Sequence, residues 1–106
     1  MAWFYLILAG LLEILWAYGM KASQGFTRPV WSAVTLAAMA ASVGLLALAM
    51  RSLPLGTAYA IWTGIGALGA FILGIVALGE AATPMRILSA ALILAGLIGL
   101  KLATPS

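Results

Sequence analysis

The 106-residue chain is 66% hydrophobic and only 7% charged, with a net charge of +3 at pH 7, which excludes an ordinary soluble domain and indicates a membrane protein. Its five basic residues are scattered and form no patch, which argues against a nucleic-acid-binding role. The sequence has no cysteine and no histidine, so it offers no disulfide framework and lacks the commonest metal ligand; we expect no cofactor.

The few charged residues divide the chain into four apolar segments. A membrane-spanning helix needs roughly 20 apolar residues to cross a hydrocarbon core of about 30 Å. We therefore expect helices near 3–20, 30–50, 55–78 and 84–103, forming one four-helix transmembrane unit over residues 1–106. Arg86 and Lys101 fall within the fourth segment, so their side chains must extend toward the membrane surfaces.

Prolines mark where the last three helices should begin. Pro29, Pro54 and Pro84 each stand at an expected first turn, where a missing N–H costs nothing. The connections "SQGFTRP", "RSLPLGT" and "GEAATP" are short, and short connections place consecutive helices antiparallel. The sequence thus predicts an all-α integral membrane protein with four spans.

The distribution of Lys and Arg does not choose an orientation. Lys21, Arg28 and Arg86 fall on the side opposite the N-terminus, and Arg51 and Lys101 fall on the same side as it. The difference in Lys and Arg count between the two sides is too small for the positive-inside rule to predict an orientation. Two interpretations fit: a weakly oriented monomer, or a chain that inserts both ways round.

Glu13 is the one carboxylate inside a predicted span. It lies about 15 Å along the first helix, near the bilayer midplane, where an ionised side chain costs several kcal/mol. No basic residue in the chain reaches that depth. Glu13 is therefore either permanently protonated and hydrogen-bonded between helices, or it is neutralised by a proton or a transported cation.

Several aromatic and small residues fall at helical spacing around the same depth. Aromatic faces attract cations, and hydroxyl groups can hydrogen-bond a carboxylate, so convergence on Glu13 would produce a cation-binding site. The alternative is that the two deep tryptophans, Trp16 and Trp62, pack against lipid. No nucleophile–base pair or metal constellation supports an enzyme. The candidate lining residues are Gly10, Trp16, Met39, Ser42, Tyr59 and Trp62.

One chain looks like half of a transporter, because transporters commonly build a midplane site from two repeats and Glu13 has no counterpart in the second half. Ala91, Ala95 and Gly99 have the small-xxx-small spacing that lets helices pack closely, either against a second copy or within the monomer. Gly64 and Gly66 weaken the middle of the third helix and suggest a hinge.

The stretches "AGLLEILWAYGMKASQGFTR" and "LPLGTAYAIWTGIGALGAFILG" resemble the first and third helices of the small multidrug resistance family. Trp16, Ser42 and "GTAYAIWTGIGA" resemble its guanidinium-exporting branch. The resemblance implies an antiparallel homodimer of oppositely inserted copies in the cell inner membrane, exchanging guanidinium for protons. It implies that Glu13 is the shared substrate and proton site, that Trp16, Ser42, Tyr59 and Trp62 line the pocket, and that Gly64 and Gly66 form the hinge.

Three other functions remain open at the level of sequence. An exporter of hydrophobic quaternary cations belongs to the same class, although Trp16 would fill the space beside Glu13. A rotor-ring subunit of a rotary ATPase also carries an acid in mid-helix, but usually with two helices. A non-transporting accessory subunit of the membrane is the alternative from another class.

Overall fold

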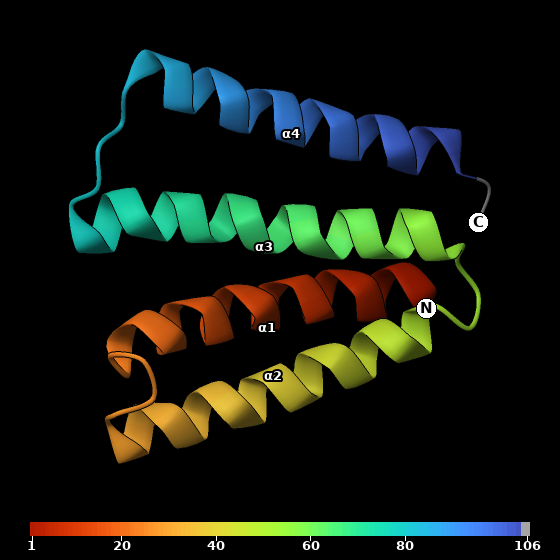
Figure 1. Cartoon of the computed structure of the whole chain (residues 1–106). Coiled ribbons are helices and arrows are strands. Elements are labelled where there is room, and N and C mark those ends of the chain that lie inside the picture. The colour runs from red at the N-terminus through yellow and green to blue at the C-terminus, as the bar shows by residue number, and fades with distance from the viewer. Residues whose placement is uncertain (105–106) are drawn as a thin grey trace.

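The computed structural model describes residues 1–104, which form four α-helices joined by short connections (Figure 1). These are α1 (Ala2–Ala22), α2 (Pro29–Ala49), α3 (Leu55–Leu78) and α4 (Pro84–Ala103). All four are long and apolar enough to cross a membrane, which confirms the predicted spans to within two residues at each end. Pro105 and Ser106, which the prediction included in the same unit, lie outside the described residues.

The prolines stand where the sequence placed them. Pro29 and Pro84 are first-turn residues of α2 and α4, and Pro54 is the N-cap of α3. The Thr83 side chain adds a cap by accepting a hydrogen bond from the backbone N–H of Arg86 at 3.3 Å. Proline at a first turn loses no intrahelical hydrogen bond, so these residues define the starts of three helices.

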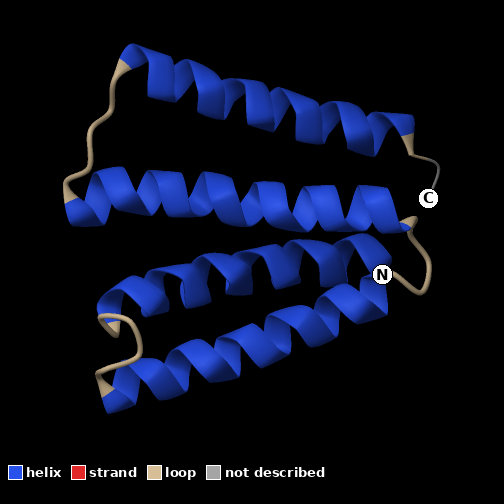
Figure 2. Ribbon diagram, viewed as in Figure 1, coloured by secondary structure: helices blue, strands red, loops and turns tan. Residues whose placement is uncertain are grey.

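The helices lie side by side in one layer, in the spatial order α2, α1, α3, α4 (Figure 2). The Cα trace measures 42 × 34 × 16 Å, so the layer is little more than one helix thick. Helix α1 packs against both α2 and α3, whereas α4 packs mainly against α3 and has no buried residue. A single layer leaves two broad apolar faces without a protein neighbour.

The buried core lies where α1, α2 and α3 meet, near the N-terminal end of α1. Its members are small or aliphatic side chains from three helices and one connection: Leu6, Ala9, Leu46, Ala49, Leu53, Ala58 and Ile61. Small residues let the helix backbones approach closely, which is how membrane helices gain packing contacts. This core joins the first three helices, and Leu97 of α4 packs against it as a partly buried neighbour.

The two charged side chains within α4 leave the apolar middle of the helix, as expected for snorkelling residues. Lys101 places its ammonium group 4.6 Å from the ring centroid of Trp3. Arg86 turns back toward the α3–α4 connection, where its guanidinium donates a hydrogen bond to the carbonyl of Ala81. Neither charge lies in the middle of the layer.

Helix α3 is continuous through its glycines, from Leu55 to Leu78. Gly64 and Gly66 are both buried by neighbouring helices. Leu97 of α4 lies where a side chain at Gly64 would be, and Glu13 of α1 lies where one at Gly66 would be. In this conformation these two glycines serve close contact between helices. The hinge role that we expect for them remains a prediction.

Candidate functional site

Glu13 lies at mid-length on α1 and faces the backbone of α3. A Cβ at Gly66 would collide with the Glu13 carboxylate, so the absence of a side chain there is what lets the acid lie against α3. The Oε1 atom of Glu13 is buried and has no hydrogen-bond partner among residues 1–104. The position is about 17 Å along a helix about 31 Å long, close to the middle of the span.

Trp16 follows Glu13 by one turn of α1 and presents a second unpaired polar atom. Its Nε1 is buried and makes no hydrogen bond to any residue that the structure describes. Leaving a buried donor or acceptor unpaired costs about 1–3 kcal/mol each, and native structures rarely leave such groups without a partner. This turn of α1 thus presents a buried acceptor and a buried donor at i, i+3 spacing, neither of them paired within residues 1–104.

Ser42 and Trp62 form a second polar cluster that ties three helices together. The Ser42 hydroxyl, which is fully buried, donates to the carbonyl oxygen of Ala9 at 2.6 Å. Its oxygen accepts a hydrogen bond from Nε1 of Trp62 at 3.0 Å. Ala9 is one turn before Glu13 on α1, so this cluster lies beside the helical turn that carries the acid.

If the lining residues converge on Glu13, the hydroxyl groups expected to hydrogen-bond its carboxylate are those of Ser42 and Tyr59. A serine has a single O–H donor, and in this chain Ser42 donates it to Ala9 instead. The ring of Tyr59 packs against Trp62, with centroids 5.6 Å apart at 52°, and the residue is 53% exposed. Within residues 1–104 the site residues thus separate into the Glu13–Trp16 pair and a cluster of Ser42, Trp62 and Tyr59.

The remaining predicted lining residues differ in their surroundings. Gly10 is buried one turn before Glu13, where a side chain would collide with Ile65 of α3. Met39 lies half-buried on α2, one turn before Ser42. Gly10 therefore supports the α1–α3 contact, and Met39 belongs to the same stretch of α2 as the Ser42 cluster.

The small-residue stripe of α4 is exposed in the single chain. Ala91, Ala95 and Gly99 are all exposed, and a Cβ built at Gly99 meets nothing within 4 Å. Contact between α3 and α4 includes Leu97, which faces Gly64. Within residues 1–104 of the single chain, Ala95 and Gly99 therefore do not pack against another helix.

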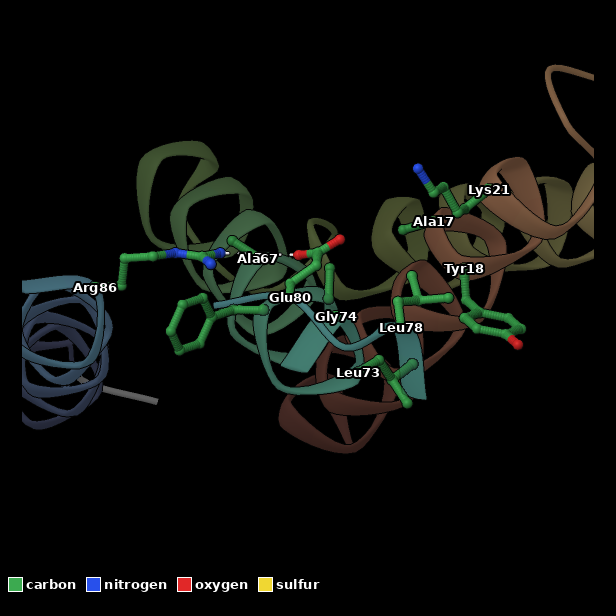
Figure 3. Close-up of a pocket in the computed structure, with 11 residues that line it drawn as sticks. Ala17, Tyr18, Lys21, Ala67, Leu73, Gly74, Leu78, Glu80 and Arg86 are labelled. Carbon is green, nitrogen blue, oxygen red and sulfur yellow. Dashed lines mark ion pairs between the residues drawn. The ribbon is translucent and has the colours of Figure 1, made fainter. Parts of the chain in front are cut away.

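A cavity of about 390 Å³ opens at the end of α1 and α3, beside the α3–α4 connection (Figure 3). Ala17, one turn beyond Glu13, lines it, as do Lys21, Glu80 and Arg86. Glu80 lies in the predicted connection "GEAATP", and the sequence alone indicates no role for it. The sequence signal for its position is the glycine before it: Gly79 ends α3 in the left-handed conformation, with φ of 70°, and turns the chain back toward α3.

Comparison with known proteins identifies both a family and individual relatives. The family model for the Small Multidrug Resistance protein matches residues 1–93. A protein of Yersinia pseudotuberculosis serotype I (strain IP32953) is 67% identical over 104 residues, covering 98% of this chain and 100% of the relative. Proteins of Escherichia coli (strain K12) and Citrobacter freundii are 61% and 60% identical over 104 residues, covering 98% of this chain and 99% of each relative. All three relatives are named "Guanidinium exporter".

Proposed function

This chain belongs to the Small Multidrug Resistance protein family, and we propose that it exports guanidinium and small substituted guanidinium cations in exchange for protons. Membership of this family and four helices long and apolar enough to cross a membrane support a multi-pass membrane protein, and the exporter names of the relatives support transport rather than catalysis. The relatives named above support guanidinium as the substrate.

The observation that carries this proposal is the unpaired, buried Oε1 of Glu13 at mid-span. An intramembrane acid without a cationic neighbour is a site for a proton or a transported cation. Guanidinium is planar and offers N–H donors in one plane, a shape that matches a carboxylate. Aromatic rings such as that of Trp62 add a cation–π surface next to the same turn of α1.

A second, oppositely inserted copy would complete the site. The Trp16 N–H needs an acceptor that residues 1–104 do not supply, and a carboxylate of the partner copy would supply one. The single helical layer has an open broad face, and the exposed stripe of Ala91, Ala95 and Gly99 on α4 offers a close-packing surface. We therefore propose an antiparallel homodimer in the cell inner membrane, with the two Glu13 side chains in one chamber.

Exchange follows from competition for the same carboxylates. Bound guanidinium favours the charged form of the acids, so protons leave as the ion binds. Returning protons remove the negative charge that holds the ion, so guanidinium leaves. The two fluxes are coupled because each site is occupied either by protons or by guanidinium, and never productively by both.

The test is guanidinium-driven proton movement in liposomes that contain the purified protein. The wild-type chain should release protons when guanidinium is added, and Glu13→Gln should abolish both proton release and transport. Glu13→Asp keeps the carboxylate and should retain partial activity. Circular dichroism and gel filtration would show whether each variant is folded; undiminished transport by a folded Glu13→Gln protein contradicts the proposal.

The same assay separates this function from export of hydrophobic quaternary cations. Trp16 follows Glu13 by one turn of α1 and its Nε1 is buried, and we expect a bulky indole at this position to favour a small planar ion over a large one. We expect proton release with guanidinium and none with tetraphenylphosphonium. Release with both ions would favour the broader exporter.

A further inference from the structure

Helix α3 carries two glycines that each face a carboxylate. A Cβ at Gly66 would collide with the carboxylate of Glu13, and a Cβ at Gly74 would collide with that of Glu80. Eight residues along a helix correspond to a rise of about 12 Å. The two acids of the chain therefore lie against the same helix, one in the middle of the span and one near its end.

Glu80 reaches α3 although it lies outside the helix. Gly79 adopts a left-handed conformation that turns the chain back, and the backbone N–H of Glu80 then donates to the carbonyl of Gly74 at 2.9 Å. This turn places the Glu80 carboxylate over the glycine surface at the end of α3. Its position is thus set by backbone geometry rather than by chance rotation of a loop side chain.

The guanidinium group of Arg86 occupies the place beside this carboxylate. Its Nη2 lies 3.8 Å from Oε1 of Glu80, and its Nη1 donates to the carbonyl of Ala81. Its central carbon lies 5.1 Å from the ring centroid of Phe71 (Figure 3 draws the ion pair). A carboxylate, a carbonyl and an aromatic face are three kinds of group that recognise a planar guanidinium.

This arrangement lies at the mouth of the cavity of about 390 Å³. Glu80 and Arg86 line its charged end, and their side chains are 45% and 39% exposed. Ala17 also lines the cavity and is one turn, about 6 Å of helix rise, from Glu13. An ion held by Glu80 would thus lie in a cavity whose lining extends to Ala17, one helical turn from the deep acid.

We propose that Glu80, the face of Phe71 and the carbonyl of Ala81 form an outer binding site for free guanidinium and small alkylguanidinium ions. Arg86 is the tethered competitor in this site: it carries the same functional group and must move aside for the ion to bind. The proposal rests on the function proposed above, since it takes the same cation as the ligand.

The proposed outer site should bind guanidinium weakly and exchange it rapidly. A tethered group competes at an effective concentration in the millimolar range, and an exposed ion pair is easily opened. Weak binding suits an entry site, because a tightly held ion would not move on to Glu13. Lys21, which also lines the cavity, adds a positive charge that further limits affinity for a cation.

The experiment measures guanidinium binding in a Glu13→Gln background, so that the deep acid does not contribute. Purified protein in lipid bicelles would be titrated with guanidinium chloride while the amide resonances of Gly74, Gly79 and Glu80 are followed by NMR. Tetramethylammonium chloride at equal ionic strength serves as the reference salt. We expect saturable shifts with guanidinium and none with tetramethylammonium.

Two substitutions then separate the ligand from its competitor. Arg86→Met should tighten guanidinium binding about two- to fivefold, because an exposed ion pair no longer has to be opened. Glu80→Gln should remove saturable binding altogether. Arg51→Met is the matched control, because this arginine lies in the α2–α3 connection at the opposite end of the layer; it should leave the affinity unchanged.

Arg86→Lys provides a second test should the methionine variant fail to fold, since it keeps the charge without the planar donors. It should compete less well than arginine and so also tighten guanidinium binding. Unchanged or weaker binding in the Arg86 variants, or saturable binding that survives Glu80→Gln, overturns the proposal.

Transport by the otherwise wild-type chain distinguishes this inference from the proposed function. Glu80→Gln should raise KM for guanidinium about two- to fivefold and leave the maximal rate unchanged. If transport depends on Glu13 but no binding at the outer site is detected, the inference of an outer site is overturned and the proposed function stands. Outer-site binding without any transport would overturn the proposed function instead.

Discussion

Trp62 donates its indole N–H to the hydroxyl oxygen of Ser42 at 3.0 Å, and the Ser42 hydroxyl in turn donates a hydrogen bond to the carbonyl of Ala9 at 2.6 Å. Two consecutive hydrogen bonds thus connect α3 to α2 and α2 to α1 at the depth of the deep acid. The ring of Trp62 is held in one orientation, with Tyr59 against it. This relationship makes Ser42 a positioning residue, and it leads to the first prediction.

Ser42→Ala should destabilise the protein and loosen Trp62. The change leaves the part-buried indole N–H of Trp62 without its acceptor, which costs about 1–3 kcal/mol of unfolding free energy. Thermal unfolding followed by tryptophan fluorescence would measure the loss and would also report the altered indole environment. Ser32→Ala is the control on the same helix, because its hydroxyl bonds only to the carbonyl of Arg28 at an exposed position; a loss as large in this variant would contradict the argument.

Gly66→Ala should displace the Glu13 carboxylate and lower transport at least tenfold. The added methyl group would occupy the position of the carboxyl group, so either the acid or helix α3 must move. Overpacking of this kind typically costs about 1–3 kcal/mol of stability. Gly44→Ala on α2 is the control, because a Cβ there meets nothing within 4 Å. Equal transport by the two variants would show that the close approach of α3 does not position Glu13.

Insertion in both orientations can be measured with single cysteines, because the natural sequence contains none. Gln24→Cys in the α1–α2 connection should react with a membrane-impermeant maleimide in about half of the copies in intact cells, since the Lys and Arg counts favour neither orientation. Ser52→Cys, at the opposite end of the layer, should give the same fraction. Full labelling at one position and none at the other would establish a single orientation.

Ala95→Leu should separate the two copies of the proposed dimer. Ala95 is exposed in the single chain and lies in the middle of the small-residue stripe, where a larger side chain would hold two α4 helices apart. Light scattering of the protein in detergent would show a shift from dimer to monomer mass. Ala103→Leu, at the end of the same helix, should remain dimeric, and dimers of normal stability in Ala95→Leu would place the interface elsewhere.

Much of the fold follows from simple features of the chain. Long intervals without charge, interrupted by Pro29, Pro54 and Pro84, are enough to predict four helices with boundaries correct to within two residues. Boundaries are well determined here because proline is excluded from a helix interior but tolerated in its first turn. The last two helices, 55–78 and 84–103, begin and end as predicted.

The candidate site was only partly predictable. Glu13 is identifiable because an acid in a membrane span is costly, and the structure leaves its Oε1 buried and without a partner among residues 1–104. The bond from Ser42 to Ala9 was not predicted, since a hydroxyl at mid-depth has several acceptors within reach and a sequence does not rank them. Glu80 was missed because the backbone turn at Gly79, rather than any periodicity, brings it onto α3.

By itself, the amino-acid sequence determined the number of spans, their boundaries and the depth of Glu13, because hydrocarbon thickness and helix rise convert residue number directly into depth. Tertiary structure alone decided which side chains meet. Whether Ser42 pairs with Trp62, or Glu80 with Arg86, depends on how helices rotate and turn against one another, and an apolar segment without a strong polar face leaves that rotation open until the helices pack.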